Sequence, residues 1–526
     1  MRCISMPKAG RPLAHLSVAV VILLSAALAA VPAVAQEAVY PGEEWEYVWR
    51  DARALQAYGW SRPELSRAWR FIRDSSKTTG LMVIDRGRVI LEFGDVEGLS
   101  YVASVRKSIL AMLYGRYVED GTIDLEKTLA QLGMDDVGGL LDIEKQATIH
   151  HLITARSGVY HPASNSGDNL ADAPERGSQR PGEYMLYSNW DFNAAGAVFE
   201  QETGVNIYDA LEEQLAIPLQ FQDWDRSAQR KSGNLEISRN PAYHMWLSTR
   251  DMARIGYLML REGRWGDEHV ISRDWARRIS SVVTPLDGMN PVWRRDGSLG
   301  YGYMWWIWDG PNAVGPFEGA YQASGAWGQW IIVMPVLDLV IAHKTNAVYR
   351  RSTSGATRQR LIDLLLDAKL DADGKPYPWR AEVAAGVLNG ADSLVTHTDR
   401  YSLASALAHR AIAIDSTEGT LLRALGVFKR ITQLDPQSIY ALYAVGRTAL
   451  LANTDLDLAV RSFKQYLEHE QQPEIPSHAA ARWRLGMVYE LQGRIEEARA
   501  EYEAALRLDP SFARAGEALG KLLPKR

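Results

Sequence analysis

The sequence predicts an α/β (α+β) domain with an antiparallel sheet and a helical insert, followed by an all-α domain. Apolar, strand-like segments lie at both ends of the region 36–385, with helical and loop-rich sequence between them. This order fits one sheet that is closed by the N- and C-terminal segments of the domain. After Trp379 the composition shifts to Ala, Leu, Arg and Glu at helical spacing. With 526 residues and 47% apolar composition, the chain can bury more than one core.

Residues 1–35 have the pattern of a secretory signal peptide. Basic residues precede an apolar run from Leu16 to Ala30, and Ala33 and Ala35 supply the small residues of a cleavage site. The run is shorter than the roughly 20 residues that span a bilayer comfortably. We therefore expect cleavage after Ala35 and a periplasmic or secreted protein; an uncleaved anchor is the alternative. The one cysteine, Cys3, lies in this segment, so the mature chain would have no disulfide or thiolate chemistry.

The strand-like segments of the region 36–385 are short and rich in β-branched and aromatic residues. They are 81–84, 89–93, 303–308, 330–334 and 339–343. The first two flank a turn and predict a β-hairpin, and the last two are joined by a turn at Pro335 to Asp338. Apolar residues at helical spacing predict a helix from Ala103 to Glu119.

A Ser-x-x-Lys sequence, Ser104 to Lys107, opens this predicted helix. Residues three apart lie on one helix face, so the amine can reach the hydroxyl and accept its proton during attack. The helix N-terminus can also receive a developing oxyanion. A second Ser-x-x-Lys begins at Ser5 within the predicted signal peptide, so the motif alone is weak. An ordinary helix start capped by Ser104 is the alternative.

Tyr187, Ser188 and Asn189 form the one Tyr-[Ala/Ser]-Asn sequence of the chain, after a Gly- and Pro-rich stretch at 176–183. They offer a phenol and an amide that could close the same site as Ser104. Together the two motifs suggest acyl transfer through a covalent serine ester. A tyrosine in an ordinary loop, with Asn189 as a turn former, is the alternative.

Four ordered stretches carry a family resemblance. They are Ala103–Ser108, Ala155–His161, Tyr187–Asn189 and Gly325–Pro335. Over about 80–346 the chain resembles serine hydrolases of the β-lactamase-related superfamily, specifically class C-like esterases and 6-aminohexanoate-dimer hydrolases. The resemblance implies that Ser104 is the nucleophile and Lys107 its base. It also implies that Tyr187 is a second acid/base group and that Asn189 binds Lys107 or the substrate.

The Gly-rich turn in the last of these stretches is predicted to contact the substrate through Gly325, Trp327 and Gln329. The Ser104 amide would be one oxyanion donor, and we expect the second near 323–326. β-Lactamases carry a cation on the strand before this turn, where it pairs with the substrate carboxylate, but Ala320–Ser324 contains no Lys, Arg or His. Loss of such a contact costs about 1.5–3 kcal/mol. The pattern therefore favours esters or amides other than penicillins.

Other polar and aromatic groups are expected to be structural. They are the histidines His150, His151 and His161, the tryptophans Trp305, Trp306 and Trp308, the loop Arg294–Gly297, and Lys344. The histidines lack metal-ligand spacing, so no metal is expected. The tryptophans are expected in the sheet core and the Arg294 loop in solvent. Lys344 follows the hairpin and is expected to be structural.

The region 400–526 is predicted to consist of tetratricopeptide repeats. In the clearest unit, 479–510, the pattern residues are Leu485, Gly486, Tyr489, Ala498, Tyr502, Ala505 and Pro510. Small residues let two helices pack closely and aromatics fill the groove between them. A weaker unit covers about 439–473, a half unit ends at Pro436, and 511–523 is predicted to cap the array.

The leading hypothesis is a serine hydrolase that cleaves a small ester or amide, with no cofactor. One alternative is a β-lactamase or D-alanyl peptidase. Another is a catalytically inert protein whose repeats bind a protein or peptide partner. The net charge of −6 gives no footprint for nucleic acid. No other long apolar run follows the signal peptide, so we expect no membrane contact after cleavage.

Overall fold

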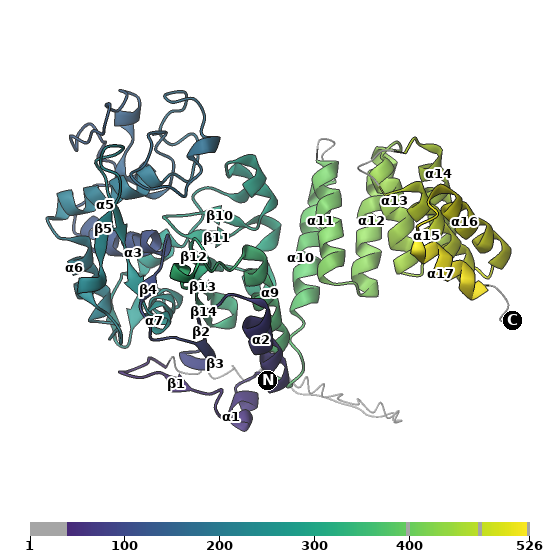
Figure 1. Cartoon of the computed structure of the whole chain (residues 1–526), viewed down its shortest axis with the longest axis horizontal. Coiled ribbons are helices and arrows are strands. Elements are labelled where there is room, and N and C mark those ends of the chain that lie inside the picture. The colour runs from purple at the N-terminus through teal and green to yellow at the C-terminus, as the bar shows by residue number, and fades with distance from the viewer. Residues whose placement is uncertain (1–38, 396–399, 472–475, 523–526) are drawn as a thin grey trace, which may run out of the picture. The chain divides into compact units, whose positions relative to one another are not determined.

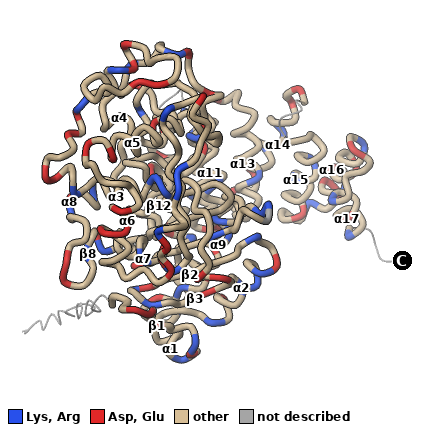
Figure 2. The backbone as a smooth tube through the Cα atoms, turned by 60° about the vertical axis from the view of Figure 1, so that its left-hand side comes forward, with Lys and Arg blue, Asp and Glu red and all other residues tan. Residues whose placement is uncertain are grey.

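The computed structural model describes residues 39–395, 400–471 and 476–522 (Figure 1). The predicted signal peptide lies outside the described residues, so cleavage after Ala35 stays a prediction. Within the described ranges, no helix combines the length and the apolar character needed to cross a bilayer. Basic and acidic residues are interspersed along the chain, in keeping with its small net charge (Figure 2).

An eight-stranded sheet forms the centre of the first domain, in the order β1-β3-β2-β14-β13-β12-β11-β10. Its strands are β1 (Glu46–Tyr47), β2 (Gly80–Asp85), β3 (Arg88–Gly94), β10 (Leu299–Tyr301), β11 (Trp306–Trp308), β12 (Tyr321–Gly325), β13 (Gln329–Met334) and β14 (Leu339–Lys344). β14 pairs with β2 from Leu339 opposite Asp85 to Lys344 opposite Gly80, which joins the two ends of the domain as predicted. The sheet is mixed rather than wholly antiparallel, because β1 runs parallel to β3 at the edge. Two residues of strand are too few to show a period in the sequence.

Alternate side chains of the central strands enter two different cores. Met82 and Ala342 point to the face covered by α3 (Val105–Glu119) and α7 (Thr249–Leu260). Leu81 and Ile341 belong to the core on the opposite face, where α2 (Arg62–Ser75) and α9 (Gly355–Ala368) pack together. Because both faces are buried, these strands are continuous apolar runs rather than alternating ones.

The predicted helical insert lies between β3 and β10. It contains β4 (Ser100–Tyr101), α3, α4 (Ile149–Ile153), α5 (Asn189–Thr203), α6 (Ile207–Leu211), β5 (Arg230–Ser232), β6 (Ala242–His244), β7 (Trp246–Leu247), α7, β8 (Arg264–Trp265), β9 (Glu268–His269) and α8 (Arg273–Ile279). The strand predicted over 303–308 is too long at its start. The chain turns after β10 at Met304, which has φ +60°, and β11 begins at Trp306. The unbroken apolar and aromatic run at 303–308 gives no sign of this turn.

The C-terminal part is all helical, as predicted. Its helices are α10 (Trp379–Leu394), α11 (Tyr401–Ile414), α12 (Glu418–Leu434), α13 (Ile439–Leu451), α14 (Leu456–Glu468), α15 (His478–Leu491), α16 (Ile495–Leu508) and α17 (Ala513–Leu522). A Cβ on Gly446 would lie 2.9 Å from the Phe463 ring, and one on Gly486 would lie 2.4 Å from Tyr502. Only glycine allows these helices to approach so closely. α12, the helix of the predicted half repeat, packs against α11, which packs in turn against α10. The exact limits 36–385 and 400–526 stay a prediction.

Candidate active site

Ser104 lies at a sharp turn between β4 and α3. The preceding residue, Ala103, has φ +49°, and Ser104 is the residue that begins the helix. Such a conformation costs an alanine about 1–3 kcal/mol and persists only where packing imposes it. The packing here comes from β12, because a Cβ on Gly325 would lie 2.5 Å from the Val102 carbonyl oxygen and 3.0 Å from the Ser104 nitrogen. Glycine at position 325 therefore lets the strand edge approach the Ser104 amide.

The amine of Lys107 lies at the centre of a buried polar cluster. Its Nζ is 3.1 Å from Ser104 Oγ, 2.6 Å from Tyr187 Oη and 2.7 Å from Asn189 Oδ1. The side chain is 1% exposed. A neutral amine has two N–H donors and one lone pair, so three partners can satisfy it without a positive charge.

The surroundings favour this neutral form. Burial, and next the neighbouring Arg106 cation, hold the pKa of the Lys107 amine well below its ordinary value, against the opposing effect of Asp168. Arg106 is held in place because its guanidinium donates to Asn193 Oδ1 (3.0 Å) and lies 4.2 Å from the centre of the Tyr243 ring. The site therefore contains an amine that is poised to accept a proton.

Tyr187 is the phenol of the cluster. Burial raises its pKa to about 12, against the opposing effects of a hydrogen bond with Ser104 and of the Arg106 and Arg294 cations. The phenol is thus protonated near neutral pH and available to pass a proton. Its ring stacks on Trp306, with ring centres 5.4 Å apart.

Asn189 begins α5, and two contacts fix the direction of its amide. Its Nδ2 donates to the Ser166 carbonyl (2.9 Å), and its backbone N–H donates to Asp168 Oδ2 (2.9 Å). The amide oxygen is therefore left facing Lys107. The loop 166–168 positions one of the three partners of the amine.

The Gly-rich turn lies next to this cluster, but its residues differ in position. Trp327 is 46% exposed, and its ring centre lies 6.1 Å from that of Tyr101, at the base of the Ser104 turn. Gln329 is fully buried, and its Nε2 donates to the Thr345 carbonyl (2.6 Å). His343 Nδ1 lies 2.8 Å from the Gly328 carbonyl. The Gln329 amide is thus occupied in holding the turn, whereas Trp327 remains free to contact a ligand.

Two residues of the site were not predicted from the sequence. Trp306 was expected in the sheet core with Trp305 and Trp308; those two are buried, but Trp306 is half-buried and covers Tyr187. Arg294 was expected in solvent. Instead its guanidinium lies 5.1 Å from the centre of the Trp306 ring and 5.9 Å from that of Tyr187, and it donates to Asn169 Oδ1 (2.6 Å). Strand alternation could have separated Trp306 from its neighbours, but no sequence pattern marks Arg294.

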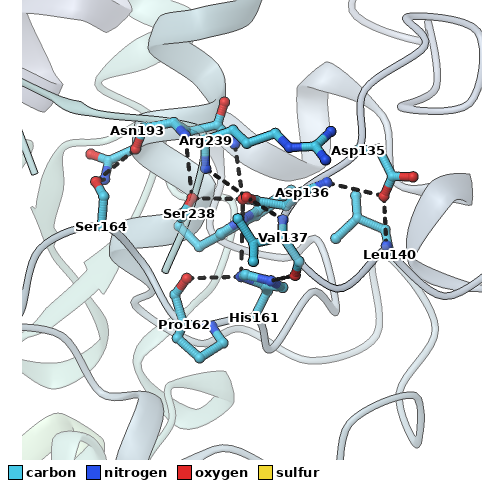
Figure 3. A network of polar contacts seen from close by, with 12 residues as sticks. Asp135, Asp136, Val137, Leu140, His161, Pro162, Ser164, Asn193, Ser238 and Arg239 are labelled. Carbon is cyan, nitrogen blue, oxygen red and sulfur yellow. Dashed lines mark hydrogen bonds and ion pairs between the residues drawn. The ribbon is translucent and has the colours of Figure 1, made fainter. Parts of the chain in front are cut away.

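A buried carboxylate, Asp136, supports the segment that follows Asn189 (Figure 3). It accepts hydrogen bonds from Trp190 Nε1 (2.6 Å), Ser238 Oγ (2.6 Å), the Arg239 and Val137 backbones (2.6 and 2.7 Å), and Asn240 Nδ2 (3.2 Å). Burial alone would raise its pKa, but these hydrogen bonds bring the pKa below the ordinary value. Asp136 therefore ties its own loop and the loop 238–240 to the start of α5.

The histidines serve structural contacts. His161 Nε2 lies 2.7 Å from the Val137 carbonyl oxygen, and its Nδ1 lies 2.8 Å from the Pro162 carbonyl oxygen (Figure 3). Both carbonyl oxygens can only accept hydrogen bonds. His150 Nδ1 contacts the Tyr303 hydroxyl (3.1 Å). In the part of the chain that the structure describes, no three His, Cys, Asp or Glu residues form a group suited to a metal ion. Lys344 donates to the Gly98 (3.0 Å) and Leu247 carbonyls, which is a structural role as predicted.

Comparison with known proteins identifies the family. The beta-lactamase family model matches residues 74–364, more than half of the chain, and a tetratricopeptide repeat model matches residues 448–511. The chain therefore belongs to the beta-lactamase family and carries a tetratricopeptide repeat. This membership supports a hydrolase as its general class.

Individual relatives are distant. An uncharacterized protein of Alkalihalophilus pseudofirmus is 20% identical over 47% of this chain and 73% of its own length. The probable UDP-N-acetylglucosamine–peptide N-acetylglucosaminyltransferase SPINDLY of Solanum lycopersicum is 33% identical, over 19% of this chain and 10% of its own. Similar solved structures include a putative 6-aminohexanoate-dimer hydrolase from Bacillus anthracis, with a TM-score of 0.42 and 19% identity over 56% of this chain and 81% of that chain. Another is EstCE1, a hydrolase with promiscuous acyltransferase activity, with a TM-score of 0.44 and 16% identity over 60% of this chain and 99% of that chain.

Proposed function

We propose that this protein is a serine hydrolase that cleaves a small ester or amide through an acyl-Ser104 intermediate. One observation carries the proposal: the Lys107 amine is buried, has a lowered pKa and lies within hydrogen-bond distance of Ser104, Tyr187 and Asn189. The structural Lys344 is also buried and its pKa is also lowered by burial, but it donates to two backbone carbonyls, whereas Lys107 contacts the hydroxyls of Ser104 and Tyr187.

The chemistry follows from these positions. Ser104 Oγ attacks the substrate carbonyl carbon while its proton passes to the neutral amine of Lys107. The developing oxyanion lies near the Ser104 N–H, one of the first helical amides, which have no intrahelical partner, and near the end of β12 at Gly325. Tyr187, hydrogen-bonded to Lys107, passes the proton to the leaving group as the carbonyl re-forms. Water then attacks the acyl-Ser104 ester by the same proton route in reverse, releasing the acid.

Intact-mass spectrometry of the protein mixed with 4-nitrophenyl acetate tests the proposal. We expect a transient adduct of one acetyl group and a burst of 4-nitrophenol, both absent from Ser104→Ala. Ser108→Ala is the matched control, because Ser108 lies one turn further along α3 and donates to the Met304 carbonyl (2.6 Å). Equal product release from the parent and Ser104→Ala, with no adduct, would refute the nucleophile.

The proposal extends to location and partners. The signal pattern of residues 1–35 supports export to the periplasm or medium. The repeat helices α11 and α13 line a largely apolar groove, which includes Ile412, Tyr440 and Tyr443. A groove of this kind suits a peptide or helix of a partner protein. N-terminal sequencing of the exported protein tests the first part, and we expect a start at Gln36.

A further inference from the structure

A cavity of about 490 Å³ adjoins the candidate active site at β11 and β12. Two of the residues that line the cavity adjoin the candidate active site. Ser324 lines the cavity and is followed by Gly325, which touches the Ser104 turn. Trp306 also lines it, and its ring stacks on Tyr187. The cavity therefore borders the cluster of Ser104, Lys107 and Tyr187 through these two residues.

Two arginines line the cavity from segments that are far apart in the chain. Arg294 comes from the single-turn segment η6 (Val292–Asp296), and Arg358 from the start of α9. Each guanidinium lies near tryptophan: that of Arg294 is 5.1 Å from the Trp306 ring centre, and that of Arg358 is 5.8 Å from the Trp330 ring centre. The flat indole surfaces keep both cations in place without neutralising them.

Both cations lack an anionic partner. Over the described ranges, neither Arg294 nor Arg358 forms an ion pair, and the Nε of each is buried without a hydrogen-bond partner. Burial lowers the pKa of Arg294, and it lowers that of Arg358 to about 10. Both side chains are half-buried, and an anion in the cavity would supply the charged partner that neither guanidinium has.

A neutral group completes the lining. The buried side-chain oxygen of Gln322 also has no hydrogen-bond partner within the described residues. Gln322 pairs with Trp306 across the sheet, and both residues line the cavity with the two arginines. A side-chain amide can turn to present either its N–H groups or its oxygen to a bound molecule.

We propose that this cavity binds a carboxylate group of the substrate through Arg294 and Arg358. The enzyme would then prefer esters or amides that carry a carboxylate a few bonds from the scissile carbonyl. The inference rests on the proposed serine hydrolase function and specifies its substrate class. The strand Tyr321–Gly325 contributes no cation, so the charge comes instead from a loop and a helix. Guanidinium groups suit a carboxylate because they offer parallel N–H donors to its two oxygens.

The test uses the complete protein and two matched pairs of esters. In the first pair the carboxylate is on the leaving group: 4-carboxyphenyl acetate against methyl 4-acetoxybenzoate. In the second it is on the acyl group: mono-4-nitrophenyl glutarate against 4-nitrophenyl valerate. A charge-assisted contact corresponds to about tenfold to a hundredfold in kcat/KM. We expect at least about a tenfold preference for the charged member of one pair.

Variants assign that preference to the arginines. Arg294→Gln and Arg358→Gln should each lower the charged-to-neutral ratio of kcat/KM by about tenfold, and Arg294→Lys should lower it less. Arg295→Gln and Arg360→Gln are matched controls: Arg295 Nε donates to the Met289 carbonyl (2.8 Å), and Arg360 is exposed on α9. Neither should change the ratio. A ratio near one in the parent for both pairs, or a preference that both Gln variants retain, would overturn the proposal.

A binding measurement separates this proposal from the hydrolase proposal. In Ser104→Ala, which should not turn over ester, Trp293, Trp306 and Trp308 line the cavity and report binding by fluorescence. The charged member of the preferred pair should bind at least about tenfold more tightly than the neutral one, and adding Arg294→Gln should remove the difference. If the parent hydrolyses no ester, the same titration is made with both pairs. Equal affinities within both pairs would then refute the cavity assignment independently of catalysis.

Discussion

Asp136 and Lys107 are both buried, ionisable side chains near the start of α5, but their surroundings act in opposite directions. Asp136 accepts hydrogen bonds from five donors, and its pKa lies below the ordinary value despite burial. Lys107 is hydrogen-bonded to the uncharged side chains of Ser104, Tyr187 and Asn189, lies beside the Arg106 cation, and has a pKa well below the ordinary value.

The difference separates a structural charge from a chemical group. The hydrogen bonds hold Asp136 as an anion, and they stabilise the connection between two loops and the start of α5. The fold lowers the pKa of Lys107, which gives up stability in favour of an amine that releases its proton more readily and can act as a base. Loss of the Asp136 carboxylate should lower stability, and loss of the Lys107 amine should lower activity.

The largest effect is expected for Lys107→Met. The variant removes the base, so kcat/KM for a turned-over ester should fall by about 10²–10⁴-fold. The free energy of unfolding should stay the same or rise, because an apolar side chain of similar length replaces a buried amine. Steady-state kinetics and urea unfolding measure the two. A large loss of stability with activity retained in the folded fraction would contradict the comparison.

The opposite pattern is expected for Asp136→Asn. The amide cannot accept all five hydrogen bonds, so the free energy of unfolding should fall by about 3–5 kcal/mol. Asp142→Asn, at an exposed position in the same region, should change it by less than about 0.5 kcal/mol. Urea unfolding of both variants is the measurement. A loss below about 1 kcal/mol for Asp136→Asn would show that the network is dispensable.

His343 is a third case, a buried group that is fully satisfied in its neutral form. Its Nε2 lies 2.7 Å from Thr78 Oγ1 and its Nδ1 lies 2.8 Å from the Gly328 carbonyl. Burial lowers its pKa to about 4 from 6.5, against a smaller opposing effect of the Gly328 hydrogen bond. Above pH 6.5 neither state binds the proton; between 6.5 and 4 only the unfolded state does. The free energy of unfolding should therefore decrease as the pH is lowered from 6.5 to about 4.

The expected slope is about 1.4 kcal/mol per pH unit for one group. Other groups titrate in the same range, so the test compares the parent with His343→Asn in urea unfolding at several pH values. The difference in unfolding free energy between the two should narrow as pH falls from 6.5 to 4. A constant difference would show that folding does not lower the pKa of His343.

Periodicity and local motifs predict much of this molecule. The apolar runs around residues 81–93 and 330–343 place the central strands, and Ser104 and Lys107 share a helix start because their spacing is local. The structure also brings Tyr187 and Asn189 to Lys107, as the family resemblance implies. The catalytic roles of these residues stay predictions that the variants above test.

Other features depend on tertiary contacts that leave no trace in the sequence. Arg294 reaches Tyr187 because a loop folds back over Trp306, and no spacing or composition records that path. Gln329 belongs to a turn that resembles a substrate-binding one, yet its amide is bonded to Thr345, a partner 16 residues away. Long-range pairing thus decides whether a polar residue near the site faces ligand or protein.

The smallest predicted effect concerns the electrostatic cause of the Lys107 pKa. Because the base must be neutral, kcat/KM should rise with pH as one proton leaves, with a midpoint below 10.5. Arg106→Gln removes the neighbouring cation, so the rise of kcat/KM should move toward higher pH. Arg116 is an exposed arginine on the same helix, and Arg116→Gln should leave the rise at the same pH. Since burial contributes more to the lowered pKa than Arg106 does, the shift should be only part of the total. A pH–rate profile of kcat/KM for the three proteins measures it. If the midpoint of the pH profile is the same in Arg106→Gln as in the parent, burial alone lowers the pKa of Lys107. The contrast with Asp136 would then depend on solvation rather than on neighbouring charge.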